Sequence, residues 1–126
     1  MTAEPTRLMA FLLVALGGSV GAALRFAVYQ IVDATRFPWP TLSANLIGCL
    51  AIGALAPLLL ERPAAWLLVA TGLLGGFTTF SSFGLDALTL LQAGRPSAAL
   101  GYLGLSVGGG LLLCAGGFWM SSQAMR

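Results

Sequence analysis

Long uncharged stretches divide this sequence, and they constrain its fold more than any other feature. The 126 residues carry six basic and four acidic side chains, and the stretches without charge are residues 8–24, 37–60, 63–85 and 96–125. A helix needs about 20 mainly apolar residues to cross the ~30 Å hydrocarbon layer of a bilayer. Each stretch is near or above that length, so the sequence predicts four membrane crossings.

The composition agrees with a chain embedded in lipid. Hydrophobic residues make up 58% of the sequence and charged residues 8%, whereas a soluble domain carries about 25% charged residues. Lipid cannot form hydrogen bonds with the backbone, so the expected fold class is an all-α membrane protein. We place its four spans at residues 8–28, 41–60, 65–91 and 98–120. Tryptophans lie near the span ends, where their amphipathic rings prefer to be: Trp39, Trp66 and Trp119.

The connections between the spans are too short to hold a further domain. They are Asp33–Pro40, Glu61–Pro63 and Gln92–Ser97. We therefore expect residues 1–126 to form a single transmembrane domain whose function lies within the membrane. A basic residue precedes the first apolar run, but three more spans follow it, so we expect a retained span and not a cleaved signal peptide.

Several classes of function lack the residues that they need. The chain has no His, and its two cysteines, Cys49 and Cys114, lie far apart among apolar neighbours. A transition-metal site is therefore not expected, and we interpret both cysteines as small packing residues. No nucleophile–base pair is visible, so we predict that the protein is not an enzyme. A net charge of +2 is too small to indicate a nucleic-acid partner.

The arginines are divided almost evenly between the two ends of the spans. One end has Arg7, Arg62 and Arg126, and the other has Arg36 and Arg95, joined by Arg25 if that side chain extends outward. Orientation is normally set by an excess of Lys and Arg on the cytoplasmic side. The balance predicts insertion both ways round, with two copies of opposite orientation paired about a two-fold axis in the membrane plane. A small bias that sets one orientation remains the alternative.

Glycines four residues apart recur in three places and indicate close helix packing. Small residues let helix backbones approach one another in a membrane. The pairs are Gly17 and Gly21, Gly72 and Gly76, and Gly104 and Gly108. Such pairs also arise by chance among 17 glycines, so they predict tight packing and no particular partner.

The third span carries the polar chemistry, in the run Gly-Gly-Phe-Thr-Thr-Phe-Ser-Ser-Phe at residues 75–83. Glycine holds a helix poorly, and Ser and Thr compete for backbone groups, so we predict a break near mid-membrane. Gly75 is expected to supply a positive φ that a β-branched residue adopts poorly. The freed carbonyls would suit an alkali or alkaline-earth cation. A kinked helix whose hydroxyls bond to the preceding turn is the alternative.

Polar residues of two other spans are expected to face inward. Asn45 lies several residues into the second span, and an amide in hydrocarbon is costly unless it is paired. It either faces a pathway or bonds another helix. In the fourth span Tyr102, Ser106 and Gly110 lie on one helix face. This stripe could guide an ion, and a packing stripe would look the same.

Together these motifs resemble the Fluc fluoride channels, also called CrcB proteins. The resemblance covers nearly the whole chain and depends on the run at residues 17–25, the Thr41-Leu42-x-x-Asn45-x-x-Gly48 element and, above all, the run at residues 75–83. It implies an antiparallel homodimer of four-helix subunits with two fluoride pores and a structural sodium ion at the dimer centre. It also implies a bacterial inner-membrane protein that exports fluoride passively from the cytoplasm.

The resemblance also assigns roles to individual residues. Gly75 and Thr78 correspond to sodium-binding positions that act through backbone carbonyls, and Phe80 and Phe83 to pore-lining aromatic residues. The other implied pore residues are Asn45, Ser81, Ser82, Tyr102 and Ser106, with Arg25 as a possible charge at the pore entrance. At Gly110 the family often has another hydroxyl, so the far end of the polar track is in doubt.

Two other functions remain as alternatives. A small multidrug-type proton-coupled exporter also has four spans, but it needs a titratable group in the membrane, and the one candidate here is Asp86. A purely structural membrane subunit would explain the glycines but not the cluster of hydroxyl and phenylalanine residues.

Overall fold

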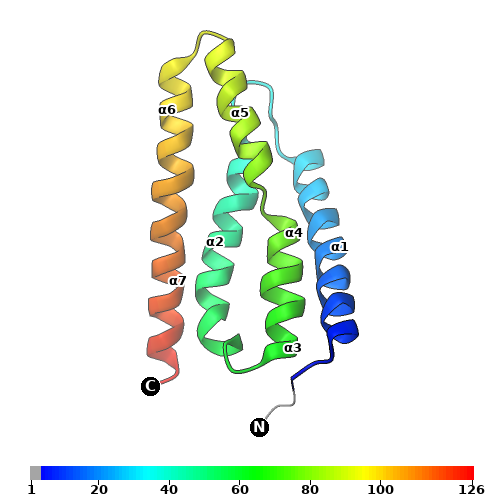
Figure 1. The fold of residues 1–126 in the computed structure, drawn as a ribbon. Helices are drawn as coiled ribbons and strands as arrows, with labels where there is room; N and C mark the ends of the chain where they lie inside the picture. Colours follow the sequence, from blue (N-terminus) through cyan, green and yellow to red (C-terminus); the bar gives the residue numbers. More distant parts are fainter. Residues whose placement is uncertain (1–3) are drawn as a thin grey trace.

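The computed structural model describes residues 4–126, which form four helical columns (Figure 1). The first two columns are α1 (Arg7–Ile31) and α2 (Trp39–Leu59). The third contains α3 (Pro63–Ala65), η1 (Trp66–Leu74), α4 (Gly75–Phe77) and α5 (Phe80–Gln92), and the fourth contains α6 (Pro96–Gly104), η2 (Leu105–Gly109) and α7 (Gly110–Ala124). All four columns are long and apolar enough to cross a membrane. The prediction of an all-helical chain with four spans is confirmed.

Proline begins three of the columns. Pro40 lies in the first turn of α2, and Pro63 and Pro96 begin the third and fourth columns. A proline in the first turn costs no helical hydrogen bond, because the first N–H groups of a helix have no partner within it. This explains why the helices start up to two residues before the predicted spans.

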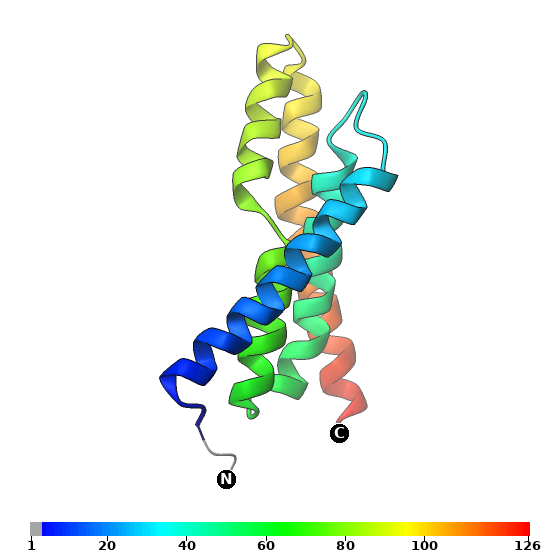
Figure 2. The ribbon, with the colours of Figure 1, turned by 90° about the vertical axis from the view of Figure 1, so that its right-hand side faces the viewer.

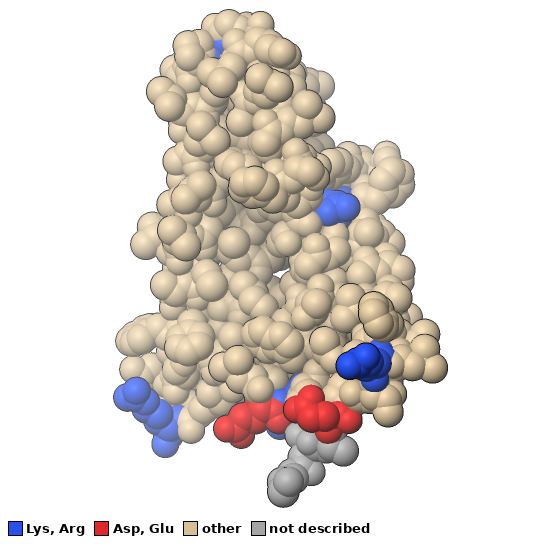
Figure 3. Space-filling view, in the orientation of Figure 1, with Lys and Arg blue, Asp and Glu red and all other residues tan. Residues whose placement is uncertain are grey.

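On the face shown in Figure 3, charged side chains gather mainly at the ends of the molecule, although a basic side chain is also visible nearer its middle. Most of those visible lie at the end that carries the C-terminus and the start of α1, and the others lie toward the opposite end. The large side chains exposed along the helices are apolar, among them Phe11, Leu12, Leu111 and Leu112. This distribution is the one that a membrane-spanning bundle requires.

Two of the three predicted glycine pairs face each other where α1 crosses the third column (Figure 2). A Cβ on Gly17 or Gly21 would lie 2.0 Å from the carbonyl oxygen of Leu68 or Leu73. From the other side, a Cβ on Gly76 would lie 2.4 Å from the Gly18 carbonyl. Gly104 and Gly108 have no such neighbour within 4 Å in the described chain.

A second close crossing, between α2 and α7, was not predicted. A Cβ on Gly53 would lie 2.1 Å from the carbonyl oxygen of Cys114, and one on Gly117 would lie 2.7 Å from that of Leu50. Because these glycines are not four residues apart on one helix, the sequence pattern did not reveal them. The crossing brings the fourth column against α2, which carries Asn45.

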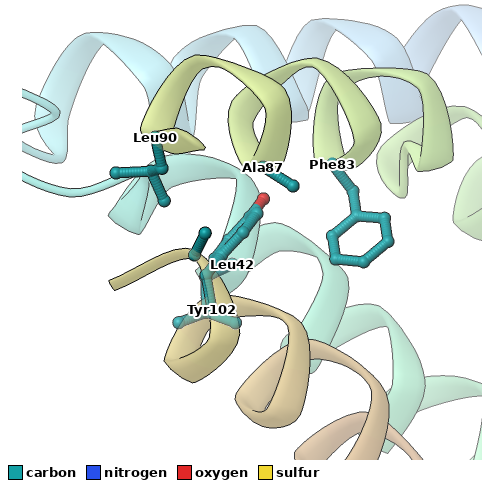
Figure 4. Packing of buried hydrophobic residues seen from close by; sticks show 6 residues of the cluster. Leu42, Phe83, Ala87, Leu90 and Tyr102 are labelled. Atoms are coloured by element: carbon teal, nitrogen blue, oxygen red, sulfur yellow. The ribbon is translucent and has the colours of Figure 1, made fainter. Parts of the chain in front are cut away.

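The buried apolar cluster lies around α5, at one end of the bundle. It consists of Leu42, Phe83, Ala87, Leu90, Ala99 and Tyr102. Tyr102 is fully buried, and Figure 4 shows its side chain between Leu42 and α5. The cluster holds α5 against α2 and α6, whereas η1 and α4 pack against α1. The third column therefore changes packing partners between α4 and α5.

Candidate functional site

The third column is interrupted at Thr78 and Thr79. Both residues are extended, with φ and ψ of −83° and 158° at Thr78 and −150° and 117° at Thr79. The break is visible in Figure 1 between α4 and α5. β-Branched residues favour such extended backbone, so the threonines form the break.

The expected positive φ at Gly75 is wrong. Gly75 is helical, with φ of −63° and ψ of −38°, and among the described residues only Gly94 has a positive φ. Of the two glycines, only Gly76 serves close packing, because it lies against Gly18 of α1. A Cβ on Gly75 would meet only the Ala70 carbonyl, at 3.9 Å.

Asn45 of α2 satisfies the backbone at the break. Its side-chain Nδ2 donates to the carbonyl of Thr79 at 3.0 Å, and its Oδ1 accepts from the N–H of Thr79 at 2.8 Å. Buried backbone groups without partners are costly, and no water is available to them in lipid. Asn45 thus replaces the helical hydrogen bonds that Thr79 does not make. The interhelical bonding that was left open for Asn45 is present.

Arg25 reaches the same break from α1. Its Nη1 donates to the carbonyl oxygen of Thr78 at 2.9 Å. The sequence left Arg25 as a charge at a pore entrance or as a side chain that extends outward to the end of its span. The structure places its guanidinium at the break, where it partners a carbonyl that the extended backbone would otherwise leave open.

Hydroxyl groups gather where α5 begins. The Thr79 Oγ1 caps the helix by accepting from the Ser82 N–H at 3.2 Å, and it also bonds the hydroxyls of Ser81 and Ser82. Thr78 Oγ1 donates back to the Leu74 carbonyl at 2.9 Å. The predicted break and the alternative of back-bonded hydroxyls therefore occur together.

A cavity of about 390 Å³ lies beside the break. Its wall comes from α2, the third column and η2. Among its lining residues are six of the predicted site residues: Asn45, Gly75, Thr78, Phe80, Phe83 and Ser106. The other predicted residues, Arg25, Ser81, Ser82 and Tyr102, do not line it.

Two phenyl rings border the cavity in different environments. The ring centroids of Phe80 and Phe83 are 5.4 Å apart, with planes inclined by 46°. Phe83 is 9% exposed, whereas Phe80 is 83% exposed. The wall at Phe80 therefore opens to the outside of this single chain.

In the described part of the chain, Ser106 Oγ is the one buried polar side-chain atom that has no hydrogen-bond partner. Its Oγ is shielded from solvent, and the residue lines the cavity. A buried hydroxyl that makes no hydrogen bond loses free energy, of the order of 1–3 kcal/mol. A ligand in the cavity that accepts a hydrogen bond would remove this cost.

Tyr102 is differently placed from Ser106, although the two share a helix face. Its hydroxyl donates to Asp86 Oδ2 at 3.2 Å, and its ring packs against Phe83 at a centroid distance of 5.4 Å. Tyr102 thus lies at one end of the stripe and links α6 to α5 through these two contacts.

Sequence reasoning missed two residues of this region. Thr79 was given no role of its own, although a Thr before a helical run is a recognisable N-cap signal. Asp86 was considered only as a titratable group of an exporter. Nothing in the sequence pairs it with Tyr102, because that contact joins two columns.

Comparison with known proteins gives a consistent result. A family model described as CrcB-like protein, Camphor Resistance (CrcB), matches residues 12–118. A fluoride-specific ion channel FluC from Methylobacillus flagellatus is 44% identical over 123 residues, covering 91% of this chain and 96% of the relative. Proteins of the same name from Paracoccus denitrificans and Pseudomonas fluorescens are 46% and 48% identical, each covering 80% of this chain, and 95% and 87% of the respective relative.

Replacing Asn45 by Leu is expected to destabilise the break. The change keeps the side chain's size but leaves the Thr79 N–H and carbonyl without partners, which costs about 2–5 kcal/mol in the free energy of unfolding. Thermal unfolding in detergent measures the loss, with Gln30→Leu, an exposed amide on α1, as the matched control. Equal unfolding temperatures for the two variants would contradict the role given to Asn45.

Proposed function

The chain belongs to the CrcB family, and from that premise we propose that it is a fluoride-selective ion channel through which fluoride leaves the cytoplasm passively. Relatives that cover most of its length carry the name fluoride-specific ion channel. The observation that carries the proposal is the cavity beside the break, which is lined by Asn45, Ser106 and two phenyl rings, with the unpartnered hydroxyl of Ser106 buried in its wall. An ion channel makes and breaks no covalent bonds, so the chain is not an enzyme.

The groups around the cavity suit a small anion that must shed water. Ser106 offers an O–H donor, and the Asn45 amide has a second N–H beyond the one that bonds Thr79. The positive edges of the Phe80 and Phe83 rings can stabilise an anion without trapping it. Several weak sites in series are what conduction requires.

A proton-coupled exporter finds less support than a channel. Such an exporter needs a titratable group that a substrate and protons share in the membrane. The one candidate, Asp86, is engaged by the Tyr102 hydroxyl and is not among the residues that line the cavity beside the break. The related proteins also carry a channel name.

We propose that two copies of opposite orientation form the working channel. The arginines are nearly balanced between the two ends, which favours insertion both ways round. The cavity is bordered by Phe80, which is 83% exposed on one chain, so a second subunit would complete the wall. Because the spans are helical and bacterial outer-membrane proteins are typically β-barrels, we place the dimer in the inner membrane of a bacterium.

The break is also the proposed place of a structural sodium ion. The Thr79 N–H that would continue the helix to Gly75 bonds Asn45 instead, which leaves the Gly75 carbonyl without that partner. The Thr78 carbonyl accepts from Arg25 and keeps a second lone pair. Hard cations prefer oxygen ligands of this kind. The carbonyl oxygens of Gly75 and Thr78 therefore fit the ion, with two such oxygens supplied by each subunit. When bound, it would supply positive charge and hold the two breaks together.

Fluoride efflux from liposomes tests the function itself. The purified protein should release fluoride far faster than chloride and faster than protein-free liposomes do. Phe80→Ile and Phe83→Ile each remove a ring edge but keep apolar bulk, and each should slow fluoride release about tenfold. Phe11→Ile, at an exposed ring far from the break in sequence, is the control. Equal release of both anions would exclude the proposed selectivity, and an unaffected double variant would remove the rings from the pore.

Dual orientation is tested by labelling in sealed vesicles. A peptide tag added after Arg126 should be accessible from outside the vesicles in about half of the molecules. The reason is that nearly balanced charge gives neither orientation an advantage. Adding three Lys at one end should shift the population to one orientation and lower the yield of dimer. A single orientation in the unmodified protein would rule out an antiparallel homodimer.

The sodium proposal is tested by dimer stability as well as flux. Replacing sodium by a bulky organic cation should lower the unfolding temperature of the dimer, because a ligand bound only by the folded state stabilises that state. In Thr78→Ser, sodium should still raise the unfolding temperature of the dimer. The serine hydroxyl can still bond the Leu74 carbonyl, and the proposed ligand is the backbone oxygen. Dimers equally stable with and without sodium would refute the site.

A further inference from the structure

We infer that the thiol of Cys49 completes the proposed fluoride pathway at the level of Gly110, where the fourth column offers no side chain. The inference rests on the proposed function, because it assigns a further residue to the same cavity. It replaces the interpretation of Cys49 as a packing residue without a polar role.

The need for such a group comes from the stripe on the fourth column. Tyr102, Ser106 and Gly110 follow one another at intervals of four residues, so they lie on one face of the helix. Tyr102 is bound to Asp86, and Ser106 lines the cavity with a hydroxyl that is buried and has no partner. The next position, Gly110, is buried and contributes no polar side-chain atom.

Cys49 occupies the space that a side chain at Gly110 would take. A Cβ built on Gly110 would lie 3.1 Å from Cys49 Sγ and 4.0 Å from Cys49 Cβ. Cys49 also lines the same cavity as Ser106. The sulfur from α2 thus lies about one helical turn beyond Ser106, where the stripe of the fourth column would otherwise end.

The position of Cys49 on α2 makes a second stripe on the opposite wall. Asn45 and Cys49 are four residues apart on one helix face, and both line the cavity. One wall therefore presents an amide and a thiol, and the other a hydroxyl and then a glycine. Polar atoms continue along the pathway because the two walls alternate in supplying them.

A thiol is chemically adequate for this task. An S–H group is a weak hydrogen-bond donor, and it can rotate to point at an anion. Weak donation suits a site that an ion must leave quickly. The second cysteine provides the contrast, because Cys114 of α7 lies against Gly53 at the helix crossing and is not among the residues that line the cavity.

Moving the polar atom from α2 to α7 tests the inference. Cys49→Ala should slow fluoride efflux about tenfold, as expected for the loss of one hydrogen bond to the ion. The double variant Cys49→Ala with Gly110→Ser should recover most of the rate, because the methyl group left on α2 would be in ordinary contact at 4.0 Å from the new Cβ. In Gly110→Ser alone, the new Cβ would be crowded by Cys49 Sγ at 3.1 Å, so the rate of fluoride efflux should not increase. Cys49→Ser should conduct at least as well as the unmodified protein, and Cys114→Ala is the matched control.

Thiol modification gives an independent measurement. In the Cys114→Ala background, a small methanethiosulfonate reagent should block efflux as mass spectrometry records one adduct on Cys49. Fluoride at high concentration should slow the labelling, because the ion and the reagent would share the cavity.

The outcomes separate this inference from the proposed function. If the unmodified protein releases no fluoride, the proposed function fails. If it conducts while Cys49→Ala conducts equally well, Cys49 is not part of the pathway. If Cys49→Ala loses activity and the double variant does not regain it, while both elute as intact dimers, the thiol has a packing role and the inference is overturned.

Discussion

The paired hydrogen bonds between Asn45 and the backbone of Thr79 are the interaction on which the rest of the site depends. A transmembrane helix can be interrupted only where its backbone groups find other partners, because lipid supplies none. Asn45 provides a donor and an acceptor to Thr79, and Arg25 provides a donor to Thr78. With those partners in place, the third column can change direction and leave a mainly apolar cavity beside the break.

Packing on each side of the break holds the two half-helices apart. Gly17, Gly21 and Gly76 let α1 approach η1 and α4 until the backbones touch. The cluster around Tyr102 binds α5 to α2 and α6 instead. The break separates these two contacts, because the half of the third column before it packs on α1 and the half after it packs on α2 and α6.

The cavity combines an apolar wall with very few polar atoms, and each of these atoms is committed in a different way. The Asn45 amide bonds the backbone of Thr79, whereas the Ser106 hydroxyl is buried and makes no hydrogen bond. Because the Ser106 hydroxyl has no partner to give up, rotation of its side chain would let it donate a hydrogen bond to a passing anion. The 83% exposed ring of Phe80 shows that one chain leaves this wall open on one side.

The sequence alone determined the four spans, the helical class and the location of the polar run, because charge and hydropathy act locally and lipid admits few structures. It also indicated the inward-facing Asn45 and the stripe through Ser106 from helical spacing. It wrongly gave Gly75 a positive φ, because the conformational freedom of glycine does not tell whether a given position uses it. Only the tertiary structure decided that Asn45 meets Thr79, that Arg25 meets Thr78, and that Cys49 fills the space beside Gly110. Each of these contacts joins different columns, and their geometry depends on how closely the helices approach, which no pattern along a single helix records.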